Sequence, residues 1–181
     1  IDVNASHWDN AIEQNALRLG MRQIDGFREV WAQAIARHRP FASIEDLARR
    51  AALPPAAVHL LADADAVRSL GFDRREGAWE ARRTPSDELP LFAAANAREL
   101  GAEADAMLPA MPASEHVAAD YQMTRLSLKR HPMQFLRGMF ASEGVLSCAE
   151  ANVVKNGKRV RVAGVVLVRQ RPGKGNAIFI T

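Results

Sequence analysis

The spacing of apolar residues changes once along this chain, and that change limits the folds open to it. Up to about residue 140, apolar residues recur every three or four positions, as in helices that bury one face. From Arg159 to Arg169, charged and β-branched residues alternate before the run becomes wholly apolar, which predicts a strand. The sequence therefore predicts an α+β fold with helices first and strands last.

Turn signals divide the helical part into short helices. Apolar residues up to Ile24 predict one helix, which ends at Asp25–Gly26. The next helix has an apolar face made of Phe27, Val30, Trp31, Ala34 and Ile35. Three further start signals follow, which are Ser43, Pro54–Pro55 and Asp73. Two helix–turn–helix units in succession are predicted, with turns at Asp25–Gly26 and Leu53–Pro54.

Charge is distributed unevenly along the chain. Residues 1–84 hold 12 Lys and Arg against 12 Asp and Glu, residues 85–120 hold 1 against 7, and residues 121–181 hold 11 against 2. Prolines, alanines and the acidic excess in residues 84–112 predict a linker with one loose helix near residues 93–106. The basic last part is a candidate for phosphate contact, and chance clustering on solvated faces is the alternative.

Composition excludes several classes of protein. No apolar run approaches the roughly 18 residues that span a bilayer, and the first residues lack the features of a signal peptide. The single cysteine, Cys148, excludes a disulfide framework, is expected to be buried and inert, and favours a reducing, cytoplasmic setting. The five histidines have no metal-ligand spacing, so neither a metal site nor a catalytic residue is predicted.

The segment around Asp25–Gly26 is the first candidate binding site. Gly26 allows a tight turn, and the backbone amides at the start of the next helix can point at a phosphate. Arg22, Phe27 and Arg28 complete the predicted DNA-binding set here. The segment resembles the helix-hairpin-helix motif of nucleic-acid proteins, which usually reads apolar-x-Gly-apolar-Gly. Arg28 replaces the second glycine, so a purely structural hairpin stays open.

A second candidate site lies in the basic strand region. Its predicted DNA-binding residues are Lys158, Arg159, Arg161, Arg169, Arg171 and Lys174. On a small β-barrel such a row follows a nucleic-acid backbone, whereas a solvated strand edge is the alternative. A turn at residues 172–176 leads to a second strand at residues 177–181. Two strands do not make a stable sheet, so the chain is expected to be a fragment that stops inside a β domain.

Taken in order, several stretches resemble the bacterial family C DNA polymerases. The matching stretches are Leu17–Phe27, Pro40–Leu47, Ala64–Gly71, Leu126–Met133 and Val160–Gly173. The last of them looks like the opening strands of an OB-fold barrel. Residues Asp2–Asp9 and Arg169–Pro172 are more similar to the error-prone, damage-inducible branch than to the replicative α subunit.

The resemblance implies five regions. They are the end of the preceding polymerase (fingers) region at residues 1–15, a tandem helix-hairpin-helix DNA-binding domain at 16–83, an acidic linker with a candidate clamp-binding peptide at 84–113, connecting helices at 114–150, and the N-terminal strands of an incomplete OB-fold domain at 151–181. The peptide is similar to the Gln-Leu-x-Leu-Phe segment that docks in a sliding clamp, and its residues are Glu88, Leu89, Leu91 and Phe92. Glu88 replaces the glutamine and cannot donate an amide hydrogen bond, so an apolar staple within the polymerase is the alternative.

The resemblance also implies a function. The parent enzyme would be a nucleotidyltransferase that extends primers on damaged templates in translesion synthesis and damage-induced mutagenesis, using two Mg²⁺ ions held by palm aspartates. No palm motif occurs here, so this piece is expected to hold primer-template or single-stranded DNA without catalysis. Implied partners are the sliding clamp, an inactive Y-family polymerase and a RecA-like protein, with no membrane. Alternatives are a non-enzymatic DNA-repair adaptor, a replicative relative, and a module that binds an acidic protein.

Overall fold

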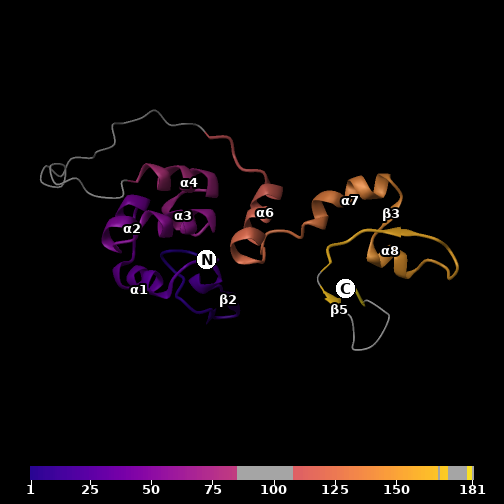
Figure 1. Cartoon of the computed structure of the whole chain (residues 1–181), viewed down its shortest axis with the longest axis horizontal. Coiled ribbons are helices and arrows are strands. Elements are labelled where there is room, and N and C mark those ends of the chain that lie inside the picture. The colour runs from indigo at the N-terminus through magenta and orange to yellow at the C-terminus, as the bar shows by residue number, and fades with distance from the viewer. Residues whose placement is uncertain (85–107, 167, 171–178, 181) are drawn as a thin grey trace, which may run out of the picture. The chain divides into compact units, whose positions relative to one another are not determined.

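The computed structural model describes residues 1–84, 108–166, 168–170 and 179–180, which fall into two compact units, Ile1–Ser127 and Leu128–Thr181 (Figure 1). The first unit contains β1 (Ala11–Glu13), β2 (Ala16–Arg18), the 3₁₀ helix η1 (Met21–Gln23), α1 (Glu29–His38), α2 (Ile44–Arg50), α3 (Pro55–Asp63), the 3₁₀ helix η2 (Arg68–Leu70), α4 (Arg74–Arg83) and α6 (Ala113–Thr124). The second contains α7 (Met133–Ser142), β3 (Val145–Leu146), α8 (Cys148–Asn152), β4 (Arg161–Val162), β5 (Arg169–Gln170) and β6 (Phe179–Ile180). Helices and short strands together make an α+β chain.

A single hydrophobic core holds the first unit together. Its largest fully buried side chains include Met21, Ile24, Ile35, Ile44, Leu47 and Leu61. Burying one such side chain contributes about 1.5–3 kcal/mol. Val3 is also fully buried, and its backbone N–H donates to the Ala66 carbonyl at 2.9 Å. The boundary predicted between residues 15 and 16 therefore divides residues that pack in one core.

The predicted start signals of α2, α3 and α4 are confirmed. The Ser43 hydroxyl accepts a hydrogen bond from the Asp46 amide at 3.0 Å and caps α2. Pro55 is the first residue of α3, where its missing N–H leaves no bond unmade. Asp73 and Glu76 form a reciprocal capping box at α4, with two bonds of 2.9 Å. Side chains next to each helix end therefore explain where these helices begin.

Removing the α4 cap should have a measurable cost. Asp73→Ala is expected to lower the free energy of unfolding by about 0.5–2 kcal/mol, because the Glu76 amide loses its acceptor. Urea unfolding measures the change. Asp63→Ala is the matched control, since it removes the exposed carboxylate of the last residue of α3. Its free energy of unfolding should stay within about 0.5 kcal/mol of that of the parent chain. Equal effects of the two substitutions would contradict the capping role.

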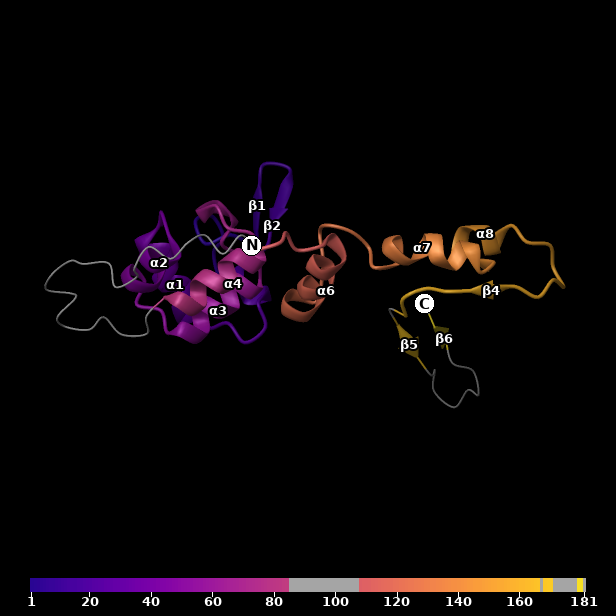
Figure 2. The ribbon, with the colours of Figure 1, turned by 90° about the horizontal axis from the view of Figure 1, so that it is seen from above.

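The helix predicted to end at Ile24 is wrong. Residues Ala16–Arg18 instead form β2, which pairs antiparallel with β1 in a hairpin where Ile12 lies opposite Leu17 (Figure 2). Long-range contacts favour this arrangement, because the Met21 amide donates to the His7 carbonyl at 2.8 Å and the Ser6 hydroxyl to the Leu19 carbonyl at 2.8 Å. Met21 and Ile24 are buried in the core but Leu17 is 59% exposed, so the spaced apolar residues of this stretch do not share one buried helical face.

The α1 helix is confirmed with one exception on its apolar face. Ala32 and Ile35 are buried and Trp31 is partly buried, but Val30 is 64% exposed. The helix begins at Glu29, so Phe27 lies in the turn and Val30 in the first helical turn. The start of the helix therefore sets which residues face the core.

Helix α6 belongs to the first unit, not to a connector between units. The Arg75 guanidinium donates to the Pro109 carbonyl at 2.7 Å and pairs with Glu115 at 3.0 Å. Both ends of the segment 85–107 thus belong to the same unit, whereas the sequence predicts a linker that runs on to a β domain. The clamp-binding candidates Glu88, Leu89, Leu91 and Phe92 and the expected loose helix lie outside the described residues.

The second unit departs from the long strand predicted at residues 159–169. Only two residues of it form β4, which pairs in parallel with β3, and β5 pairs antiparallel with β6. Neither β3 nor α8 was predicted, and Cys148 is exposed, so its predicted burial is wrong. In the described part of this unit the strands form two separate pairs. The OB-fold barrel therefore stays a prediction.

Candidate nucleic-acid interface

The first hairpin turn has the backbone form that a tight turn requires. Gly26 has a φ of 76°, in the left-handed region where a residue without Cβ is favoured. The Phe27 amide donates to the Ile24 carbonyl at 3.1 Å, and α1 begins two residues later. Phe27 is only 7% exposed. Its side chain therefore packs in the core, and its place in the predicted binding set stays a prediction.

The start of α1 is not capped by a side chain. Its N-cap residue is the exposed Arg28, which makes no capping hydrogen bond, whereas Ser43 caps α2 and Asp73 caps α4. The first amides of a helix lack partners within the helix and carry a partial positive charge. An uncapped start beside a basic residue therefore suits a phosphate better than a start already filled by a carboxylate.

The cations near this turn differ in their partners. Arg22 forms an ion pair with Asp9 at 2.6 Å. Arg28 instead lies over the Trp31 ring, with its Cζ atom 5.1 Å from the ring centroid, and has no carboxylate partner in the described part of the chain. Of the two arginines predicted at this hairpin, Arg28 is thus the one whose charge is not already balanced.

One residue at the turn was missed by the sequence analysis. The Arg125 guanidinium, 76% exposed, pairs with Asp25 at 2.8 Å, and the Asp25 amide donates to the Met123 carbonyl at 2.8 Å. The Arg125–Asp25 pair joins residues 100 positions apart and the Asp25–Met123 bond spans nearly as many, so no local pattern could reveal them. The end of α6 therefore braces the first hairpin turn from the side of Asp25.

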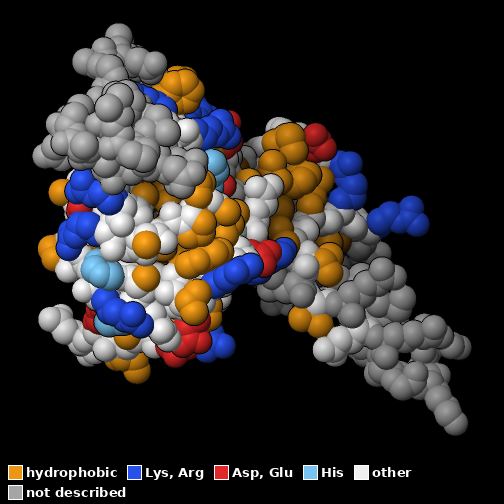
Figure 3. Space-filling view, turned by 60° about the vertical axis from the view of Figure 1, so that its left-hand side comes forward, with side chains coloured by type: hydrophobic (Ala, Val, Ile, Leu, Met, Phe, Trp, Pro, Cys, Tyr) orange, Lys and Arg blue, Asp and Glu red, His pale blue; other side chains and the backbone are white. Residues whose placement is uncertain are grey.

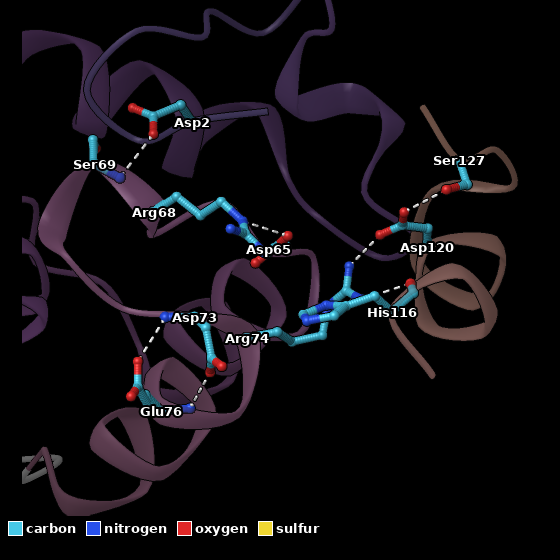
Figure 4. Close-up of polar contacts among 10 residues, drawn as sticks. All are labelled: Asp2, Asp65, Arg68, Ser69, Asp73, Arg74, Glu76, His116, Asp120 and Ser127. Carbon is cyan, nitrogen blue, oxygen red and sulfur yellow. Dashed lines mark hydrogen bonds and ion pairs between the residues drawn. The ribbon is translucent and has the colours of Figure 1, made fainter. Parts of the chain in front are cut away.

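The start of α4 is occupied by the protein's own groups. Arg74 is buried there, where it pairs with Asp120 and donates to the His116 carbonyl at 2.8 Å (Figure 4). The Ser127 hydroxyl donates to the other Asp120 carboxylate oxygen at 2.7 Å. With Asp73 on the helix amides, α4 serves to attach α6. The starts of α1, α3, α6 and α7 lack a side-chain cap, and among them α1 is the one whose N-cap residue is basic.

The structure describes only some of the predicted basic residues of the second unit. Lys158, Arg159 and Arg161 are exposed, and the Arg161 guanidinium donates to the Glu143 carbonyl. Arg169 lies in β5, while Arg171 and Lys174 lie outside the described residues. Residues 128–181 hold ten Lys and Arg against Glu143 and Glu150. The positive charge predicted here is therefore concentrated in one unit.

One of those two carboxylates is committed to a helix cap. Ser147 and Glu150 form a capping box at α8, with the Ser147 amide donating to Glu150 at 2.7 Å. Hydrogen bonds from Ser147, mainly from its backbone amide, lower the pKa of the Glu150 carboxyl. Glu150 therefore stays charged at neutral pH and subtracts one charge from the basic surface.

Other kinds of site find no support in the described residues. No group of three or more His, Cys, Asp or Glu side chains there is arranged to hold a metal ion. No described helix is long and apolar enough to cross a membrane. On the face of the first unit seen in Figure 3, Lys and Arg side chains border an area of hydrophobic side chains. In the described part of the chain, the basic residues and the uncapped start of α1 beside Arg28 are the features best suited to a ligand.

Comparisons with known proteins agree with this arrangement. Residues 1–77 match the family described as helix-hairpin-helix motif. The whole chain is 52% identical to an error-prone DNA polymerase of Brucella abortus over 190 aligned positions and 50% identical to one of Rhodopseudomonas palustris over 210, and it spans 18% of each of these proteins. A Bradyrhizobium error-prone DNA polymerase is 56% identical over 87% of this chain and 14% of its own length. The chain therefore belongs to the error-prone DNA polymerase family, in which it corresponds to one segment of a longer protein.

Proposed function

We propose that this chain is the DNA-holding segment of an error-prone polymerase that acts in translesion synthesis. One observation carries the proposal, which is the Gly26 turn leading into the uncapped start of α1 beside Arg28. Phosphate groups are the anions that a helix start and a free guanidinium recognise together. The exposed basic segment at residues 158–161 supplies a second, less specific contact to the DNA backbone.

The rest of the proposal concerns the parent protein. Nucleotide addition with Mg²⁺ is assigned to the remainder of the polymerase, because the sequence contains no stretch similar to the palm aspartates. Because bacterial DNA lies in the cytoplasm, a polymerase that holds primer-template DNA acts there. A sliding clamp, an inactive Y-family polymerase and a RecA-like protein remain partners by resemblance.

DNA affinity of the purified chain tests the proposal. Arg28→Ala is expected to weaken binding to a single-stranded oligonucleotide about tenfold, as for a lost charged hydrogen bond, and to reduce the slope of log affinity against log salt by about 0.7. Fluorescence anisotropy at several salt concentrations measures both values. Arg37→Ala is the matched control, because Arg37 is exposed near the other end of the same helix.

A variant of the second unit provides the result that would contradict the proposal. Arg159→Ala combined with Arg161→Ala is expected to weaken binding to all DNA sequences alike. It should also reduce the slope of log affinity against log salt by about 1.4. If this pair removes binding while Arg28→Ala behaves like Arg37→Ala, the hairpin does not contact DNA. The proposed role of the first unit would then be wrong.

A further inference from the structure

We infer that Trp31 is a positioning residue that holds the Arg28 guanidinium ready for a DNA phosphate. This inference rests on the proposed function of the first hairpin and adds a residue to it. Arg28 is the N-cap of α1 and Trp31 lies three residues later, so their side chains share one face of the helix start. The 5.1 Å between Cζ and the ring centroid is within the range of a cation–π contact.

The Trp31 ring is itself held in place. It is partly buried against the hydrophobic core, and the buried Phe27 ring meets it edge to face, with centroids 5.3 Å apart at 67°. Phe27 follows Gly26 directly in the chain. The turn therefore positions the Phe27 ring, which contacts the Trp31 ring, which in turn contacts the Arg28 guanidinium. An arginine on such a support loses less freedom when it binds than a freely rotating one.

The contact with Trp31 leaves Arg28 with hydrogen-bond donors. A guanidinium has five N–H donors, and a cation–π contact is an attraction between its charge and the ring that uses none of them as a hydrogen bond to a carboxylate. The donors of Arg22, by contrast, are already shared with a carboxylate at 2.6 Å. A phosphodiester oxygen is thus the chemistry that fits Arg28, with the amides of α1 beside it.

This arrangement changes how the sequence motif is understood. Because Arg28 replaces the second glycine of the motif, the sequence leaves a purely structural hairpin open. The Trp31 ring gives the added guanidinium a contact at the helix start, with Cζ 5.1 Å from the ring centroid. A cation held by an aromatic ring then takes over part of the role that close backbone approach has when glycine is present.

A double-mutant cycle on the full 181-residue chain tests the inference. Trp31→Leu is expected to weaken single-stranded DNA binding about twofold to fivefold, the strength of an exposed cation–π contact. The same substitution in an Arg28→Ala background should have no further effect, because Trp31 acts through Arg28. Trp31→Phe, which keeps an aromatic face, should recover most of the affinity.

The outcomes separate the inference from a structural role. If Trp31→Leu weakens binding equally with and without Arg28, or if Trp31→Phe fails to recover affinity in a folded protein, Trp31 does not position Arg28. An unchanged affinity of Arg28→Ala overturns the hairpin contact itself and the inference with it. Without DNA, the Arg28 side-chain N–H signal in NMR should be shifted by the Trp31 ring and should lose that shift in Trp31→Leu.

Discussion

Replacing Arg74 by alanine is expected to lower the free energy of unfolding of the first unit by about 3–5 kcal/mol. Arg74 and Asp120 are only 5% and 11% exposed in their side chains, and the substitution would leave the Asp120 carboxylate buried without its cation (Figure 4). Urea unfolding followed by tryptophan fluorescence measures the loss, since all three tryptophans of the chain lie in this unit.

Two controls isolate the buried charge as the cause. Arg75→Ala breaks the neighbouring, more exposed pair with Glu115 and should cost less than about 1 kcal/mol. Arg74→Met together with Asp120→Leu removes both charges and should recover most of the stability lost by Arg74→Ala. A loss in the double variant as large as in Arg74→Ala would mean that packing of the arginine stem, not the charge, holds α6 in place.

Gly20→Ala should be nearly as damaging, at about 3 kcal/mol or more. A Cβ atom at residue 20 would lie 2.3 Å from the Trp8 carbonyl oxygen and 2.4 Å from the Asp9 carbonyl carbon. Both are backbone atoms and cannot rotate away. The segments would have to separate, which disrupts the bond from the Arg22 amide to the Trp8 carbonyl at 3.1 Å.

A second glycine supplies the control for this prediction. Gly138 lies inside α7 and a Cβ there meets nothing within 4 Å, so Gly138→Ala should stabilise the second unit by about 0.5–1 kcal/mol. Circular dichroism during thermal unfolding reports both changes. If Gly20→Ala unfolds at the temperature of the parent chain, residues 8–10 and 20 do not pack as closely as described.

Local signals in the sequence predicted the beginnings of α2, α3 and α4. Ser43, Pro55 and Asp73 act on backbone groups within three residues, so the sequence around each position contains the whole interaction. The Gly26 turn and the family were recognisable for the same reason, because both depend on residues that are neighbours in the chain.

Tertiary structure decided the rest. Residues 16–18 form a strand because they pair with residues 11–13, while Gly20 and Met21 pack against residues 7–9. Asp120 finds Arg74 46 positions away, and Arg125 finds Asp25 100 positions away. Such pairs depend on where two helices meet in space, which the residues near each partner do not encode. The free charge of Arg28 follows from the same fact, because only the folded chain shows which arginines have already found a carboxylate.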